Sequence, residues 1–347
     1  MQRFDYFIRR LLLTIPTFLG ITLICFAITQ FVPGGPVEQA ILRMRGIGTA
    51  ESPRGTDPSR TLTQEYREHL EKHFGFDKPF HVQYWRWLVT DRVGMLRDSF
   101  KYPNKNTWQL ICSRFPVSLT FGITGFLLSY LVCIPLGIGK ALRHGSAFDF
   151  VSSVVVFIGY SIPAVALGMV LKMLFCGTVD EFWDIFPVAG FQSDNFAELS
   201  FFGQVGDRFM HMFLPVLCYV IGSFAILTML MKNSLLDQIG RDYIRTVLAR
   251  GGTASHAIWR HAFRNALIPI ATGFGRILTL LFAGSVIIEQ IFEIPGMGRL
   301  SLEAVVGRDF AVFMGIVAVQ SILGLLGYVL SDFAYVLIDP RIHFEKT

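Results

Sequence analysis

Six long apolar runs, each about as long as a membrane-spanning helix, constrain this chain more than any other feature. A helix needs about 20 mostly apolar residues to cross the hydrocarbon core of a bilayer. A large soluble core can account for one or two such runs, but not for six. Because backbone groups in lipid must be hydrogen-bonded internally, we expect an all-α, polytopic bundle of six transmembrane helices, one N-terminal helix plus a core of five. The runs, none with more than one charged residue, are 11–32, 115–139, 150–179, 209–231, 266–288 and 310–338.

The composition agrees with a membrane protein and argues against two other classes. Only 16% of the residues are charged and 52% are hydrophobic, whereas soluble domains have about 25% charged residues. The net charge of +5 comes without any lysine- and arginine-rich run, so we expect no nucleic-acid partner.

The first run, 11–32, follows Arg9 and Arg10 and is longer than the core of a signal peptide. We therefore favour an uncleaved first helix over a signal peptide.

The distribution of charge predicts which side of the membrane each connection faces, because cytoplasmic flanks of spans are rich in lysine and arginine. The N-terminus and the connections 140–149 and 232–265 carry an excess of basic residues. In 180–208, by contrast, every charged residue except Arg208 is acidic. We therefore place both termini, 140–149 and 232–265 in the cytoplasm, and 180–208 outside. The basic residues of 232–265 are Lys232, Arg241, Arg245, Arg250, Arg260 and Arg264.

The same scheme divides the chain into four parts. Residues 1–32 form the N-terminal transmembrane helix, 33–114 a periplasmic segment, 115–338 the helical core and 339–347 a cytoplasmic tail. The periplasmic segment opens with two prolines around a glycine pair, which ends a helix. We expect short amphipathic helices over 63–73 and 80–92.

Motifs for catalysis or metal binding are not evident. Gly139-Lys140 is followed by alanine where a nucleotide-binding loop needs serine or threonine, so we read Lys140 as a lysine that reaches water from a helix end. His69 and His73 are four residues apart, and a solvated helix face explains them better than a metal site. We expect no enzyme activity, no catalytic residue and no metal.

Three charged residues lie within the apolar runs, where ionisable groups are costly. Lys172 is near the outer end of its run, so its ammonium can reach water. Asp332 is near the inner end of the last run and should cap a helix or pair with a cytoplasmic basic group. Arg276 lies deeper, and a place on a hydrated path and a structural ion pair are equally good explanations.

The polar connection 232–265 has an internal pattern that a simple loop does not need. It reads as two short helices that are interrupted at Gly251-Gly252, where glycine allows the backbone to turn sharply. A short amphipathic helix parallel to the membrane is a suitable docking element for a soluble partner. An ordinary basic loop is the alternative.

This connection resembles the ATPase-coupling loop of permease subunits from dipeptide and oligopeptide ATP-binding-cassette (ABC) importers. The resemblance rests on the runs 242–246, 249–251 and 261–269 and continues over nearly the whole chain, through Val32-Pro33-Gly34-Gly35-Pro36, Pro295-Gly296-Met297-Gly298 and Asp339-Pro340-Arg341-Ile342. Within the family, 158–164 and 228–234 look most similar to the YejB-type branch, which takes up peptides and peptide-like compounds of the microcin C type. The coupling residues that the resemblance implies are Asp242, Tyr243, Ile244, Arg245, Thr246, Ala249, Arg250 and Gly251.

The resemblance also implies a set of partners. These are a second permease subunit, an ABC ATPase with two nucleotide-binding domains, a periplasmic substrate-binding protein, the peptide substrate and the lipid bilayer. ATP and Mg²⁺ would bind to the ATPase and no cofactor to this chain, which would form half of the translocation path. We place Tyr160, Arg276, Glu289 and Gln320 on that path. A channel or secondary transporter without an ATPase is the alternative function, and a membrane-embedded enzyme would need catalytic residues that we do not find.

Overall fold

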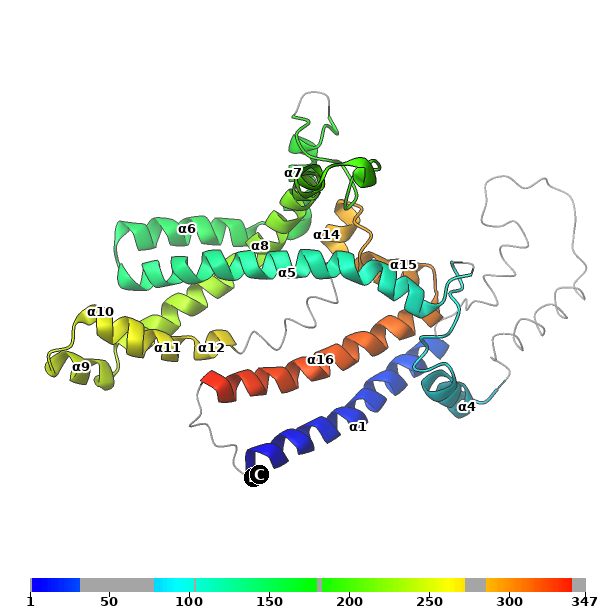
Figure 1. Cartoon of the computed structure of the whole chain (residues 1–347), viewed down its shortest axis with the longest axis horizontal. Coiled ribbons are helices and arrows are strands. Elements are labelled where there is room, and N and C mark those ends of the chain that lie inside the picture. The colour runs from blue at the N-terminus through cyan, green and yellow to red at the C-terminus, as the bar shows by residue number, and fades with distance from the viewer. Residues whose placement is uncertain (1, 32–77, 103, 180–182, 272–284, 339–347) are drawn as a thin grey trace, which may run out of the picture. The chain divides into compact units, whose positions relative to one another are not determined.

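The computed structural model describes residues 2–31, 78–102, 104–179, 183–271 and 285–338, and these residues are all-α (Figure 1). Within this described part the only β-type pairings are two isolated bridges, Asp98 with Asn106 and Cys176 with Asp184. The all-α prediction is therefore confirmed.

Four described helices are long and apolar enough to cross a membrane. They are α1 (Gln2–Phe31), α5 (Thr107–Leu142), α8 (Phe201–Ile239) and α16 (Phe310–Ile338), and each contains one of the predicted apolar runs. Three of them extend well beyond their runs: α1 begins at Gln2 instead of 11, α5 begins at Thr107 instead of 115, and α8 continues to Ile239. α5 thus begins before the predicted boundary at 114/115, because polar first turns such as Thr107 to Arg114 can remain helical outside the apolar run.

The predicted run 150–179 is two helices, not one. α6 (Ala147–Ser161) and α7 (Ala164–Phe175) meet at an angle of 91° across a short break. Pro163 explains the break, since proline has no N–H for an intrahelical bond and keeps the preceding residue out of the helical region. Ile162 accordingly has an extended conformation (φ −84°, ψ 119°).

The count of six spans is only partly tested. The described helices give four spans, or five if the bent pair α6–α7 is one span. The fifth predicted span, 266–288, lies largely outside the described residues, with only α12 (Ile268–Ala271) at its beginning and α14 (Val286–Ile291) at its end described.

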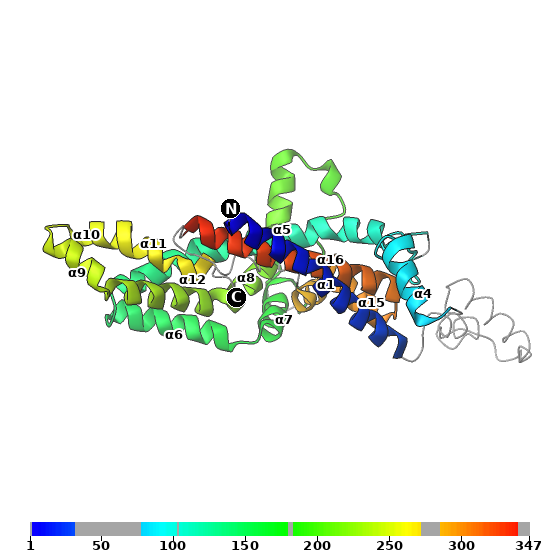
Figure 2. The same cartoon turned by 90° about the horizontal axis from the view of Figure 1, so that it is seen from below.

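The chain divides into two compact units, and the first contains residues 1–14, 114–299 and 323–347. In this unit α6 and α7 pack along α8 (Figures 1 and 2). One apolar cluster joins α5, α8 and α14 near Phe121, Leu214 and Ile288. A second cluster joins the other end of the α5–α8 pair to the short helices after α8. Its buried members are Ile138, Ala141, Met231, Leu235, Ile244, Ala257, Ala262, Ala266 and Ile270.

The second unit contains residues 15–113 and 300–322. Its helices include α4 (Phe80–Trp85), which continues into the π-helical turn η1 (Arg86–Thr90), so the helix predicted over 80–92 is confirmed. Its core gathers Phe26, Trp87, Met314 and Ala318. Asp309 precedes α16 and accepts hydrogen bonds from Ser99 Oγ (2.5 Å) and from the backbone N–H of Lys101 (3.2 Å), which fastens the segment before α5.

Two of the charged residues within the apolar runs are described. Asp332 forms an ion pair with Arg10, a basic residue near the N-terminus, so the predicted pairing is confirmed. Lys172 keeps 17% of its side chain exposed, and its Nζ donates to the carbonyl of Ile291 (2.8 Å) and to Glu293 Oε1 (3.3 Å). Lys140, which we read as a lysine reaching water, is fully buried. The sequence thus shows where charged residues lie in the apolar runs, but it does not identify the groups with which they pair.

Candidate functional site: the helical connection after α8

The connection after α8 contains a short amphipathic helix, α9 (Asp242–Ala249). Arg241, in an extended conformation, precedes it, and Asp242 places a negative charge in the first turn, where the helix dipole favours it. Only Ile244 of α9 is buried, with 3% of its surface exposed. The helix therefore has one face held by the protein and one face open.

Two residues of α9 hold it in place. Ile244 packs into the cluster formed by α5, α8 and the helices that follow α9. Tyr243 donates from its hydroxyl to Gln238 Oε1 on α8 (2.8 Å) and accepts from Asn265 Nδ2 (3.2 Å). Because these contacts reach α8 on one side and Asn265 on the other, α9 is fixed relative to the C-terminal end of α8.

The end of α9 is a Schellman motif, which is a common way to terminate a helix with a glycine in the left-handed region. Gly251 has φ +84°, its N–H donates to the carbonyl of Leu248, and that of Gly252 donates to the carbonyl of Val247, both at 3.0 Å. A Cβ on Gly251 would meet no atom within 4 Å, so its side chain is excluded by backbone conformation alone. A Cβ on Gly252 would lie 2.8 Å from the carbonyl oxygen of Val247.

The chain then continues through three short helical pieces. α10 (Ala254–His256), the π-helical turn η3 (Ala257–Ala262) and α11 (Phe263–Ala266) follow one another without a gap. The prediction of two helical arms interrupted at the glycine pair is confirmed. Ala257, Ala262 and Ala266 are buried in the same cluster as Ile244, since small side chains let the arms approach closely.

The open face of α9 contains most of the predicted coupling residues. Asp242, Arg245, Thr246, Ala249, Arg250 and Gly251 are exposed, whereas Tyr243 is half-buried and Ile244 is buried. The pair of Arg245 with Asp242 (3.6 Å) lies on this exposed face, where ion pairs stabilise little. The structure thus separates the predicted set into two residues that hold α9 and six that a partner could contact.

Of the four residues predicted to lie on the translocation path, Tyr160 and Glu289 lie in the described part of the first unit. Arg276 lies outside the described residues, and Gln320 lies on α16 in the second unit, half-buried. Tyr160 is on α6 and is 49% exposed. Glu289, on α14, is only 1% exposed. Their assignment to the path stays a prediction.

Glu289 has a full set of partners. Ser118 Oγ donates to its Oε1 (3.0 Å), and the N–H of Arg299 donates to its Oε2 (2.8 Å). The same Ser118 hydroxyl accepts from the N–H of Met297 (2.7 Å). A Cβ on Gly296 would lie 2.5 Å from the carboxyl carbon of Glu289, so this glycine leaves the room that the carboxylate occupies. In this conformation Glu289 connects α5 to the turn after α14.

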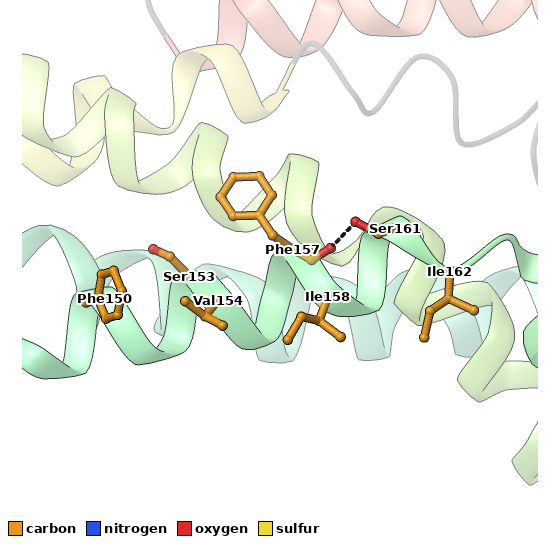
Figure 3. Close-up of a pocket in the computed structure, with 7 residues that line it drawn as sticks. All are labelled: Phe150, Ser153, Val154, Phe157, Ile158, Ser161 and Ile162. Atoms are coloured by element: carbon orange, nitrogen blue, oxygen red, sulfur yellow. Dashed lines mark hydrogen bonds between the residues drawn. The ribbon is translucent and has the colours of Figure 1, made fainter.

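A groove of about 640 Å³ follows α6, the helix that carries Tyr160 (Figure 3). Its lining is almost entirely apolar, and the hydroxyl of Ser161 is engaged with the carbonyl of Phe157 (2.8 Å). Among the described residues, only α6 and the bend after it contribute to the lining, so the groove is open on its other side. Tyr160 is not part of it. The lining residues are Phe150, Ser153, Val154, Phe157, Ile158, Ser161 and Ile162.

Sequence reasoning missed several residues that organise these sites. Ser118 was not selected, since a single serine in an apolar run has no spacing that marks it. Gly252 was predicted only as part of the glycine pair. A side chain there would clash with Val247, whereas one on Gly251 would meet no described atom. His69 and His73 lie outside the described residues.

Comparison with known proteins gives consistent similarities. Residues 133–344 match the family model described as the binding-protein-dependent transport system inner membrane component. The peptidoglycan transport system permease protein YejB of Agrobacterium fabrum is 39% identical over 98% of both chains. The inner membrane ABC transporter permease protein YejB of Escherichia coli O157:H7 is 39% identical, over 98% of this chain and 99% of its own. The dipeptide transport system permease protein DppB of E. coli K12 is 33% identical over 99% of both.

Proposed function

We propose a mechanism from one premise: this chain belongs to the family of binding-protein-dependent transport permeases, among the members that serve peptides. It is a permease subunit of an ABC importer for peptides and a multi-pass protein of the inner membrane. The resemblance to peptide importers, and to the YejB-type branch within them, is confirmed. A channel or secondary transporter without an ATPase loses its support, since the relatives are components of ABC transport systems.

The coupling to ATP, in our proposal, runs through α9. One observation supports it above the others: α9 is held on α8 through Tyr243, Ile244 and the half-buried Val247, while its other residues stay exposed. A helix fixed on one side and free on the other can insert into a cleft of a soluble partner and pass displacement to the membrane helices. The partner would be an ABC ATPase with two nucleotide-binding domains, which bind ATP and Mg²⁺.

The complete transporter would also contain a second permease subunit and a periplasmic substrate-binding protein. Each permease would form half of the translocation path, and ATP binding would shift the pair between inward-open and outward-open states because ATP binds one state more tightly. Tyr160, Arg276, Glu289 and Gln320 remain our candidates for this chain's half. Peptides are the substrate class, and peptide-like compounds of the microcin C type are candidates within it. The name of the Agrobacterium relative adds peptidoglycan to these candidates.

Reconstitution tests this function directly. The chain, together with its second permease, ATPase and binding protein, should accumulate a labelled tripeptide in proteoliposomes only when ATP and binding protein are both present. Omitting the chain should abolish uptake. Uptake down a gradient without ATP would contradict the proposal and favour a channel.

The topology is a second proposal, with six spans, both termini in the cytoplasm, residues 180–208 outside and the connection 232–265, which contains α9, inside. We predict that a periplasm-restricted thiol reagent will label Ala197→Cys and will not label Ser255→Cys. Both positions are exposed, so a difference reports on the side of the membrane rather than on burial. The parent for both variants should carry Cys112→Ser, because Cys112 is an exposed native thiol. Labelling of Ser255→Cys alone would invert the scheme.

A further inference from the structure

A buried charge cluster lies where α5, α6 and α8 meet. Asp149, in the first turn of α6, receives Lys232 Nζ of α8 at 2.7 and 2.8 Å, one distance for each carboxylate oxygen. Lys140 Nζ of α5 lies 3.2 Å from Oδ1 of the same carboxylate and donates to the backbone carbonyl of Asp149 (2.9 Å). It also donates to Ser152 Oγ (2.8 Å) and Ser153 Oγ (2.7 Å). One carboxylate thus joins three helices.

The cluster is withdrawn from solvent and carries excess positive charge. The side chains of Lys140, Asp149 and Lys232 are 0%, 7% and 12% exposed. The other groups that face Asp149 are the N–H of Gly145 (3.2 Å) and His144 Nδ1 (3.3 Å), whose ring is 62% exposed. Buried charges need partners, and here a single carboxylate compensates two ammonium groups.

The cluster adjoins the apolar cluster that holds α9. Met231, next to Lys232, and Ala141, next to Lys140, are both members of that apolar cluster together with Ile244. The helices are also very close here, since a Cβ on Gly137 would lie 2.7 Å from both Met231 Cβ and the carbonyl oxygen of Thr228. α8 continues from Lys232 to Ile239, shortly before α9 begins. A displacement of α9 therefore reaches Asp149 through continuous helix and close packing.

We propose that Asp149 is a positioning residue that makes the α5–α6 hairpin move together with α8 and the coupling helix. The inference rests on the proposed function of α9. It adds the contact through which a displacement of α9 is transmitted to α5 and α6. Apolar packing is non-directional and allows helices to slide, whereas a carboxylate bonded through both oxygens fixes position and orientation. Without this connection, α9 could move with α8 while the hairpin stayed behind.

The charge count supplies a test that separates positioning from stability. Asp149→Asn leaves two buried ammonium groups without a carboxylate, so the complex should become less abundant in the membrane. Adding Lys232→Met removes one of these charges and should restore abundance. If Asp149 acts in coupling, the double variant will remain uncoupled and will hydrolyse roughly tenfold more ATP per tripeptide imported, the factor that about 1.4 kcal/mol represents. Lys232→Met alone, which keeps the Lys140–Asp149 pair, should couple better than the double variant.

The measurements are membrane abundance and the ratio of ATP hydrolysed to labelled tripeptide imported by the reconstituted complete complex. A double variant that is abundant and couples like the wild type would overturn the proposal, since Asp149 would then only balance charge. A double variant that stays scarce in the membrane would also overturn the proposal, because removing the charge of Lys232 would then not have restored abundance. Failure of the proposed function has a different outcome, in which the wild-type complex itself shows no ATP-dependent uptake.

Discussion

Replacing Gly251 by valine will leave the chain in the membrane and remove most of the ATP hydrolysis that loaded binding protein stimulates in the reconstituted complex. Gly251 has φ +84°, a conformation that costs an ordinary residue about 1–2 kcal/mol and a β-branched one more. No atom lies within 4 Å of the new Cβ position, so the strain is relieved locally, by changing the turn after α9. The exposed face of α9 then no longer has its fixed orientation, while the transmembrane packing is unaffected.

The matched control for this variant is Gly240→Ala, in the same connection. Gly240 has φ −73°, and its Cβ would meet nothing closer than 3.7 Å, so alanine fits without strain. Stimulated hydrolysis should be normal in this control and reduced several-fold in Gly251→Val, at equal abundance. Arg245→Asp combined with Thr246→Asp should have the same effect through charge on the exposed face. If stimulation survives in both of these variants, α9 is not the coupling element.

Replacing Gly298 by alanine will reduce the amount of folded permease in the membrane. A Cβ at this position would lie 2.7 Å from the backbone nitrogen and 2.9 Å from the Cα of Val286. Backbone atoms cannot rotate away, so the turn after α14 has to shift and the Glu289 contacts with Ser118 and Arg299 loosen. Overpacking of this kind costs roughly 1–3 kcal/mol, and more where the backbone resists. Thermal stability of the purified complex and membrane abundance measure the effect.

Gly222→Ala is the comparison for Gly298→Ala. Gly222 lies on α8, and no described atom beyond its own helical turn lies within 4 Å of its Cβ position. Alanine is also preferred over glycine in a helix by about 1 kcal/mol, so this variant should be at least as stable as the wild type. Equal stability of Gly298→Ala and Gly222→Ala would show that the close contact at Val286 does not constrain the fold.

Apolar runs and glycine positions in the sequence were sufficient to predict much of this molecule. The run 310–338 became α16 with the same bounds, because a span is selected by total transfer free energy, which the composition reports. The interruption at Gly251-Gly252 was also predictable, since a glycine pair after an amphipathic segment is a local signal. Such features depend on neighbours within one or two helical turns.

Features that depend on distant partners were not predictable. The run 150–179 is apolar throughout, so its composition predicts one span, although Pro163 ends α6 and turns the chain. Lys140 has the sequence context of a lysine at a helix end, and only the approach of α6 and α8 buries it. The contact of Ser118 with Glu289 joins residues 171 positions apart. A single sequence contains no record of such contacts.

The bend between α6 and α7 has a consequence for the synthesis of the chain. α7 has 12 residues and is roughly 18 Å long at 1.5 Å per residue, too short to cross a hydrocarbon core of about 30 Å by itself. Its fixed position depends on residues made much later: Lys172 binds the carbonyl of Ile291, and a Cβ on Gly168 would lie 3.2 Å from the side chain of Ile291. During translation, α7 therefore leaves the ribosome before α8 and more than a hundred residues before α14, the two helices against which it packs. We expect this stretch to be the part of the nascent protein that insertases and membrane proteases recognise until α14 is complete.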